Sequence, residues 1–426
     1  MPAELISTVG AAGRPAAGRP ASAVPALARA TGLDAATFAE RHWGRAPLLA
    51  RAVDPHAFAD LLDLDAVDEL LSRRALRTPF IRLARDGTVV DSRSFTGSGG
   101  VGAEIADQVR DDRVAAMFGE GTTVVLQALH RTWPAVADFA RELGGELGHP
   151  VQANAYVTPA SSKGFSAHYD VHDVFVLQVA GRKHWTVHAP VHADPLRSQP
   201  WNDHAAAVAA RAADDEPALD VVLEPGDALY LPRGWLHSAT ALGGVSAHLT
   251  VGVHVVTRYA LVEALTALVA DDPRLRASLP LGVDVADPAA LGPHLEAVRE
   301  ALVDALAALP ADAVAARVRE RVWSGGRPEP VGPLAAAAFA DGLSPGDVVR
   351  PRAGLSMRVV ERGGSAVLEL PDRTLALPAS TLVALRAVTG PGRHTVGSLP
   401  GMDQADQLVL VRRLLREGVL VAATGP

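Results

Sequence analysis

The stretch at residues 164–185 reads GFSAHYDVHDVFVLQVAGRKHW. Its four consecutive apolar residues at 174–177 are typical of a buried strand. In an extended chain, residues two apart point to the same face, so His168 and Asp170 would present an imidazole and a carboxylate to one spot. Such a pair suits a metal ion. An isolated His-x-Asp is also common, however, and His168 could cap the strand while Asp170 belongs to a turn.

Short apolar segments recur around this stretch, separated by Gly, Pro and Asp: PFIRLA, TTVVLQAL, VQANAYVTP, HWTVHAP, DVVLEPGDALYLP and VSAHLTVGVHVV. Helices are expected at about 134–147 and 203–213. The strands do not alternate regularly with helices, which favours an antiparallel sandwich or barrel over a parallel sheet.

The rest of the chain differs in pattern. Residues 1–30 are rich in Ala, Gly and Pro and are expected to be flexible, with Asp34 capping the helix that follows. A domain built from these strands is expected over 31–256, and apolar residues at helical spacing predict a helical region over 257–325 that could serve as a dimer interface. Residues 335–426 predict a winged-helix-like domain. Its basic cluster, Arg412, Arg413 and Arg416, is small, so we expect it to pack or contact protein.

Composition excludes several classes of protein. The 426 residues contain no Cys, which excludes disulfides and thiolate metal sites, so a metal must be bound by His, Asp or Glu. A net charge of −8 argues against a general nucleic-acid binder and leaves room for a basic protein partner. No apolar run is long enough to span a membrane and no signal peptide is evident, which predicts a cytoplasmic protein.

A second stretch, EPGDALYLPRGWLHSAT at 224–240, is more specific. Its Pro-Arg-Gly segment predicts a tight turn at a strand end, which directs the following His237 inward. Two His and one carboxylate form a facial triad with three open coordination positions, the arrangement of non-haem Fe(II) oxygenases. A structural zinc site would close its shell with a fourth protein ligand.

These motifs together show a family resemblance. HYD, followed by GRKHW and then GDALYLPRGWLHSA, resembles the JmjC-type cupin 2-oxoglutarate oxygenases, and specifically their ribosomal-oxygenase branch. The resemblance covers about residues 34–260 and extends to the helical region and winged helix. It implies an α+β fold built on a double-stranded β-helix, the cupin/JmjC jelly roll, followed by a helical dimerisation-type region and a C-terminal winged helix.

The resemblance also implies roles for individual residues. His168, Asp170 and His237 would hold Fe(II), and Lys183 would pair with the distal carboxylate of 2-oxoglutarate. The residues themselves agree, because a lysine beside a buried strand needs an anion. Strand residues expected to line the co-substrate pocket or contact substrate, by the same resemblance, are Asn154, Tyr156, Ser246, His248 and Thr250. Core packing is an equal alternative for the last three.

Other charged residues near the motifs receive a simpler interpretation. Arg182 should point away from Lys183 into solvent, and Asp173 would alternate to the wrong face to be a ligand. The remaining histidines are interpreted as surface or satisfied core residues, namely His172, His184, His188 and His254.

The function implied by the resemblance is hydroxylation of a protein side chain, most simply Arg or His of a ribosomal protein, with 2-oxoglutarate and O2 as co-substrates. Three alternatives stay open. The substrate could be a peptide or small-molecule natural product, the reaction could be N-methyl-lysine demethylation, or the protein could be a non-catalytic metal-binding sensor. The low aromatic content, 4% of residues, offers no obvious cage for a methylated lysine.

Overall fold

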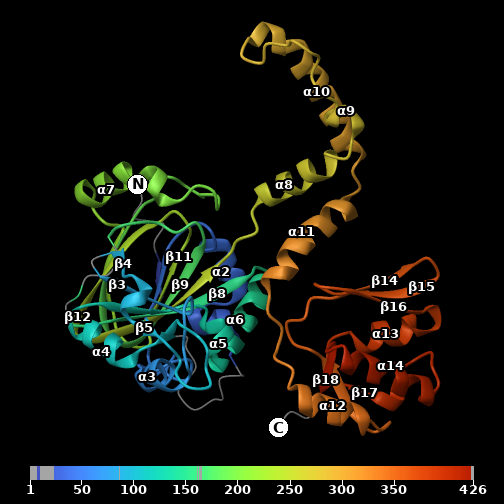
Figure 1. Ribbon diagram of the computed structural model, residues 1–426, viewed down its shortest axis with the longest axis horizontal. Coiled ribbons are helices and arrows are strands. Elements are labelled where there is room, and N and C mark those ends of the chain that lie inside the picture. The colour runs from blue at the N-terminus through green and yellow to red at the C-terminus, as the bar shows by residue number, and fades with distance from the viewer. Residues whose placement is uncertain (1–6, 10–23, 86, 161, 163–165, 424–426) are drawn as a thin grey trace. The chain divides into compact units, whose positions relative to one another are not determined.

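The computed structural model describes residues 7–9, 24–85, 87–160, 162 and 166–423. The chain divides into two compact units, Met1–Val255 and Val256–Pro426 (Figure 1). The division lies next to the expected end of the catalytic domain at residue 256. The second unit contains both the expected helical region and the expected C-terminal module, and a boundary between those two remains a prediction.

Two long antiparallel strands organise the first unit, β9 (Asp173–His188) and β12 (Leu236–Val253). Their pairing register breaks between Leu242 and Ala247, across from Gly181. Gly181 has a φ of 59°, and a Cβ there would lie 2.1 Å from the carbonyl oxygen of Val245, so only glycine fits this bend. The Gln178 amide stabilises the bend, because its Nε2 donates to Ser246 Oγ at 3.0 Å and to the Gly181 carbonyl at 3.1 Å.

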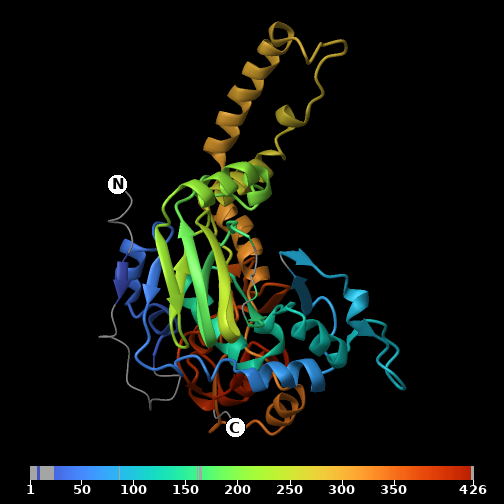
Figure 2. The ribbon, with the colours of Figure 1, turned by 90° about the vertical axis from the view of Figure 1, so that its left-hand side faces the viewer.

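The bend folds β9 over on itself. Val174 and Val187 belong to one buried cluster, although a straight strand would separate them by about 40 Å. The first half of β9 pairs with β11 (Ala228–Leu231) and the second half with β10 (Leu219–Leu223). The two halves therefore lie in facing layers, and the long strands run side by side through the unit (Figure 2).

These strands belong to a ten-stranded sheet of order β1-β2-β11-β9-β12-β8-β7-β3-β4, with β10 also paired to β9. The pairing is antiparallel throughout except between β1 and β2, which confirms the expected antiparallel architecture. The remaining strands of the sheet are β1 (Ser7–Val9), β2 (Leu48–Ala50), β3 (Ile81–Arg85), β4 (Thr88–Val89), β7 (Thr123–Leu126) and β8 (Val151–Thr158). A separate pair joins β5 (Thr96–Gly97) to β6 (Gln108–Val109).

Helices pack against one face of this sheet and form the main core with it. On β8, Ala153, Ala155 and Val157 face that core, so Tyr156 and Thr158 face the opposite side. The Asp34 side chain accepts from the Thr37 N–H and caps its helix, and the two helices expected at 134–147 and 203–213 are confirmed as α6 and α7. The helices are α1 (Ala26–Thr31), α2 (Ala35–Arg41), α3 (Leu64–Arg73), α4 (Asp111–Gly119), α5 (Leu129–Thr132), α6 (Pro134–Leu147) and α7 (Ala205–Asp214).

Two described segments that begin within the first 30 residues, β1 and α1, have regular structure where a flexible segment is expected. Leu27 and Ala30 of α1 are buried in the main core. The N–H groups of Ala26 and Leu27 donate to the Glu146 carboxylate at 2.7 and 3.1 Å. The start of α1 is thus bound to α6, while residues 1–6 and 10–23 lie outside the described residues.

The second unit begins with helices at the expected positions and ends in a small mixed module with its own core. Its helices are α8 (Arg258–Val269), α9 (Pro273–Arg276), α10 (Pro288–Ala308), α11 (Ala311–Gly325), α12 (Pro333–Asp341), α13 (Leu382–Val388) and α14 (Gln404–Arg416). Its strands are β13 (Val348–Pro351), β14 (Arg358–Arg362), β15 (Ser365–Glu369), β16 (Thr374–Pro378), β17 (His394–Thr395) and β18 (Leu420–Ala422). The expected order of helix, short extended piece, helix and terminal strand is present as α13, β17, α14 and β18, and its assignment as a winged helix remains a prediction.

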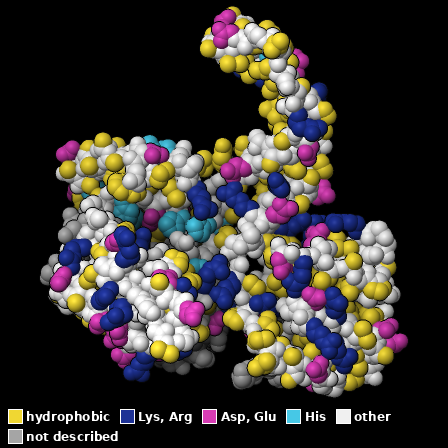
Figure 3. Space-filling model, viewed as in Figure 1, with side chains coloured by type: hydrophobic (Ala, Val, Ile, Leu, Met, Phe, Trp, Pro, Cys, Tyr) yellow, Lys and Arg dark blue, Asp and Glu magenta, His cyan; other side chains and the backbone are white. Residues whose placement is uncertain are grey.

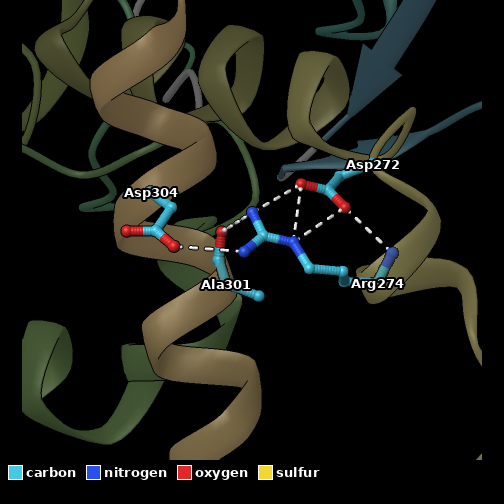
Figure 4. Close-up of polar contacts among 4 residues, drawn as sticks. All are labelled: Asp272, Arg274, Ala301 and Asp304. Carbon is cyan, nitrogen blue, oxygen red and sulfur yellow. Dashed lines mark hydrogen bonds and ion pairs between the residues drawn. The ribbon is translucent and has the colours of Figure 1, made fainter.

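A surface network joins α9 to α10 (Figure 4). The Arg274 guanidinium donates to the carboxylates of Asp272 and Asp304 at 2.9 and 3.1 Å, and to the Ala301 carbonyl at 3.3 Å. About half of the Arg274 side chain is exposed. Exposed ion pairs contribute little to stability, so this network orients the short helix more than it stabilises the fold.

Candidate active site

His168, Asp170 and His237 come together as the sequence predicts, with one ligand atom from each within 4.8 Å of the others. Their local structure differs from the expectation, however. His168 and Asp170 precede β9 and lie in a loop rather than in the strand, because β9 begins at Asp173. An isolated antiparallel bridge between His168 and His237 holds this loop against the start of β12.

Backbone carbonyls orient both imidazoles. The Nδ1 atom of His168 lies 2.7 Å from the Ser166 carbonyl oxygen, and that of His237 lies 3.1 Å from the Trp235 carbonyl oxygen. Because a carbonyl only accepts, each Nδ1 carries a proton and donates it to the carbonyl oxygen. His237 Nε2 lies 3.8 Å from Asp170 Oδ2. Hydrogen bonds such as those from the two Nδ1 atoms to backbone carbonyls orient metal-binding histidines.

The charge states of these groups also suit a cation. Burial and the neighbouring His168 lower the pKa of His237 to about 4, so its imidazole is neutral at neutral pH. Burial raises the pKa of Asp170, but nearby histidines and Arg82 outweigh it and the net pKa lies below the usual value. Two imidazoles and one carboxylate therefore face a common point, and this donor set fits a divalent transition metal.

The turn that delivers His237 depends on Gly234, as the sequence indicates. Gly234 has a φ of 87°, and a Cβ there would lie 2.8 Å from the His192 carbonyl oxygen and 2.9 Å from Pro195 Cδ. Its N–H donates to the Asp170 carbonyl oxygen at 3.0 Å. The glycine thus allows a close approach between the turn and the loop that carries Asp170.

We expect Gly234→Ala to lower the free energy of unfolding, measured in urea, by more than Gly243→Ala does. Gly243 has a similar φ of 75°, but a methyl group added there would meet nothing within 4 Å. The Gly243 variant should therefore lose only the backbone preference, about 1–2 kcal/mol. The Gly234 variant adds a steric clash to that loss, and equal effects of the two substitutions would contradict this account.

A cavity of about 270 Å³ opens beside the three residues. Figure 3 shows histidine side chains gathered on the visible face of the first unit. Polar and apolar side chains both line the cavity, as in small-molecule sites. Apart from the triad, its lining comprises Arg82, Thr123, Tyr156, Thr158, Val174, Val176, Lys183, Trp185, Trp201, Ser238, Ala239, His248 and Thr250.

Lys183 reaches this cavity from β9 and is only 3% exposed. Its Nζ donates to Thr158 Oγ1 at 3.1 Å and lies 3.4 Å from His248 Nδ1. Among the described residues, no carboxylate forms an ion pair with it, and burial lowers the pKa of Lys183 to about 7. A buried amine with neutral neighbours is poised to bind an anion.

The other predicted pocket residues divide into two groups. Tyr156, His248 and Thr250 line the cavity, and the rings of Tyr156 and His248 stack with centroids 5.1 Å apart. Asn154 is absent from the lining, because its side-chain oxygen accepts from the Ala128 N–H at 2.9 Å where α5 begins. Ser246 is also absent from it, since its hydroxyl accepts from Gln178 at the bend of β9.

The other charged neighbours behave largely as expected. Arg182 is exposed, and His184 pairs with Asp220 at the surface. Asp173 is fully buried and lies outside both the ligand cluster and the cavity lining.

Sequence analysis did not predict nine of the lining residues, and Arg82 and Trp201 are two of them. Arg82 Nη2 lies 3.5 Å from the Tyr156 hydroxyl, and the ring of Trp201 lies 6.3 Å from that of His168. For Arg82 a signal existed, because Ile81 and Leu83 on either side are buried in the main core and Arg82 must face the opposite side.

Comparisons with known proteins agree with this geometry. A family model described as JmjC domain matches residues 135–261, which include the triad and Lys183. The chain contains a JmjC domain. The domain resembles that of ribosomal oxygenase 1 from Gallus gallus, which is 32% identical over 259 residues, covering 57% of this chain and 40% of that protein.

A second relative of the JmjC domain is the bifunctional lysine-specific demethylase and histidyl-hydroxylase NO66 from Drosophila persimilis. It is 29% identical over 257 residues, covering 58% of this chain and 35% of that protein. The chain thus spans less than half the length of these relatives. The resemblance to the ribosomal-oxygenase branch is confirmed.

Solved structures show the same fold. The Escherichia coli ribosomal oxygenase YcfD matches with a TM-score of 0.51 and 20% identity, covering 92% of this chain and 98% of that one. Its complex with cobalt and succinic acid matches with a TM-score of 0.52 and 19% identity, covering 92% and 99%. The expected cupin/JmjC fold is confirmed. Among the described residues, no helix combines the length and apolarity needed to cross a membrane.

Proposed function

We propose that this chain is an Fe(II)- and 2-oxoglutarate-dependent dioxygenase that hydroxylates an Arg or His side chain of a ribosomal protein. The observation that carries the proposal is the pairing of a facial triad with a buried lysine that has no carboxylate partner among the described residues, both in one cavity. The triad fits Fe(II), and Lys183 fits an anionic co-substrate. One relative that matches the JmjC domain is named as a ribosomal oxygenase and another as a lysine-specific demethylase and histidyl-hydroxylase, which supports the same assignment.

Iron with bound 2-oxoglutarate supplies the oxidation of a substrate C–H bond by O2, with release of succinate and CO2. The protein's own residues bind, orient and exclude water. His168, Asp170 and His237 would hold the metal on one face. Lys183 and the Thr158 hydroxyl would bind the distal carboxylate of 2-oxoglutarate. A charge-assisted hydrogen bond of this kind contributes about 1.5–3 kcal/mol to the free energy of binding.

Apolar residues shield this part of the cavity from water. Val174 and Val176 line it from β9, and Trp185 stands edge-on to His248 with ring centroids 5.4 Å apart. A dry, rigid wall strengthens the ionic contact of Lys183 and leaves the open side of the triad for the substrate.

Composition bears on the choice of reaction. Aromatic residues make up only 4% of the chain and offer no obvious cage for a methylated lysine. Hydroxylation therefore ranks above demethylation, although one relative is named for both activities.

The proposed partners follow from charge and surface. A net charge of −8 suits a basic protein substrate. The side chains of the basic cluster on α14 are engaged within the second unit: Arg412 donates to the Ala340 carbonyl, Arg413 pairs with Glu417, and Arg416 pairs with Asp341. We therefore propose no direct nucleic-acid or membrane binding and a cytoplasmic location.

We also propose a homodimer formed through the helical region. Exposed apolar side chains on α8 and α10 support it, namely Tyr259, Leu261, Val262, Leu295, Val298 and Val303. Exposed apolar patches mark interaction surfaces. Light scattering on the full chain would test the dimer, which a concentration-independent monomer mass would refute.

The deciding experiment combines iron-loaded protein, 2-oxoglutarate and O2 with a mixture of isolated ribosomal proteins. We expect succinate and one ribosomal protein heavier by the mass of one oxygen atom. Succinate without a modified protein would indicate a peptide or small-molecule substrate, and release of formaldehyde from a methylated peptide would indicate demethylation. No succinate under any condition would leave a metal-binding sensor as the function.

A further inference from the structure

Two separate segments supply the metal ligands, and the distance between them sets the geometry of the centre. The loop at 166–172 carries His168 and Asp170, and the turn at 232–237 leads into His237. Backbone hydrogen bonds join the segments at two places. His168 and His237 exchange N–H···O bonds of 3.2 and 2.8 Å, and the Gly234 N–H donates to the Asp170 carbonyl at 3.0 Å.

A side chain makes a third connection. Asp173, directly after the loop, has no exposed surface. Its Oδ1 accepts from the backbone N–H of Arg233 at 3.0 Å, and its Oδ2 accepts from the Tyr230 hydroxyl at 2.5 Å. The Arg233 guanidinium lies 3.8 Å from the same carboxylate and 3.0 Å from Asp194.

The Tyr230 hydroxyl extends this connection to the N-terminal part of the unit. It accepts from the Gly44 N–H at 2.9 Å while it donates to Asp173. Tyr230 is 1% exposed and its ring stands edge-on to Phe38, with centroids 4.9 Å apart. Tyr230 is packed in the core, and its hydroxyl holds the Asp173 carboxylate in a defined position. The loop and the turn that contact this carboxylate are therefore held in position relative to each other.

A buried carboxylate is a costly way to gain stability alone. Removing a charge from water costs several kcal/mol, and apolar replacements of buried ion pairs are often neutral or stabilising. Such a group is better explained by the specific geometry that it imposes. Here that geometry is the spacing between the loop of Asp170 and the turn of His237.

We propose that Asp173 is a positioning residue for the metal centre, which fixes the turn of His237 relative to Asp170 through the Arg233 N–H and the Tyr230 hydroxyl. The inference rests on the metal site of the proposed function. Asp173 itself touches neither the metal position nor the cavity. Replacing Asp173 should weaken metal binding although His168, Asp170 and His237 are all still present in the chain.

The chain offers a matched control in Asp227. This carboxylate is 4% exposed and, like Asp173, accepts from backbone N–H groups, those of Ala52 at 2.8 Å and Glu224 at 3.0 Å. It also pairs with Arg51 at 2.6 Å. Its bonded partners lie on neither ligand-bearing segment. Asp227→Asn should therefore disturb a buried carboxylate network without changing the metal centre.

The experiment titrates Co(II) into metal-free full-length protein and follows the absorption bands of the bound ion, alongside unfolding in urea. We expect Asp173→Asn to weaken Co(II) binding about ten-fold and shift the bands, the lower end of the effect of outer partners of metal ligands. Asp227→Asn should lower stability but leave affinity and spectrum as in wild type. Asp173→Glu, which keeps the carboxylate, should recover part of the affinity.

Tyr230→Phe replaces Asp173→Asn in the experiment if the latter does not fold. It removes one of the two hydrogen bonds that Asp173 accepts and keeps the aromatic ring. We then expect a smaller loss of Co(II) affinity in the same direction. Equal Co(II) affinity in wild type, Asp173→Asn and Tyr230→Phe would overturn the positioning role alone, as would equal losses in Asp173→Asn and Asp227→Asn. If wild type itself bound no Co(II), both the proposed function and this inference would fail.

Discussion

His237→Ala is expected to abolish 2-oxoglutarate turnover and to lower Co(II) affinity by more than about 100-fold, beyond the range for outer partners of a metal. The reason is that His237 supplies one of three donor atoms that lie within 4.8 Å of one another. The two remaining donors cannot form the three-ligand facial site. Succinate release and the absorption of bound Co(II) measure the two effects.

His184→Ala is the matched control for this substitution. His184 lies on β9 next to Lys183, but its side chain points outward and pairs with Asp220 at the surface. Co(II) affinity and succinate release should stay within about two-fold of wild type, the range of an exposed pair. If His237→Ala bound Co(II) as tightly as wild type, the metal would lie elsewhere and the triad would lose its assigned role.

Local pattern is sufficient to predict the strands and the turn before His237, but not the loop that carries His168 and Asp170. Short apolar segments indicate the strands. Pro-Arg-Gly indicates the turn, which requires glycine because Gly234 has a positive φ and no room for a methyl group. His-x-Asp was placed in a strand because two-residue spacing gives a common face. The structure brings the same two side chains together in a loop that is bonded to the turn.

What the pattern could not predict depends on partners distant in sequence. Asn154 lies on the same face of β8 as Tyr156, which lines the cavity. Its side-chain oxygen, however, accepts a hydrogen bond from the Ala128 N–H at the start of α5. Arg82 meets Tyr156 only because β3, β7 and β8 are neighbours in the sheet. Asp173 alternates away from the ligand face as expected, yet its bond to the Arg233 N–H requires the turn some sixty residues later to be in place.

Lys183 should make 2-oxoglutarate binding depend on pH. Burial lowers its pKa to about 7 in the folded protein, so the amine is charged below that pH and increasingly neutral above it. A bound carboxylate favours the charged form and raises the pKa again. Binding above about pH 7 must therefore take up one proton, and affinity should fall up to ten-fold per pH unit towards about pH 9. Below pH 7 the affinity should be constant.

Substitutions of Lys183 separate its charge from its titration. Lys183→Met should weaken 2-oxoglutarate binding by ten-fold or more at neutral pH, from the loss of a charge-assisted bond of about 1.5–3 kcal/mol. Lys183→Arg keeps a charge that does not titrate in this range, so its affinity should no longer fall above pH 7. Calorimetry of 2-oxoglutarate binding to the Co(II)-loaded protein measures all three. A wild-type affinity that does not change between about pH 6 and pH 9, or the same slope in Lys183→Arg, would show that another group holds the co-substrate.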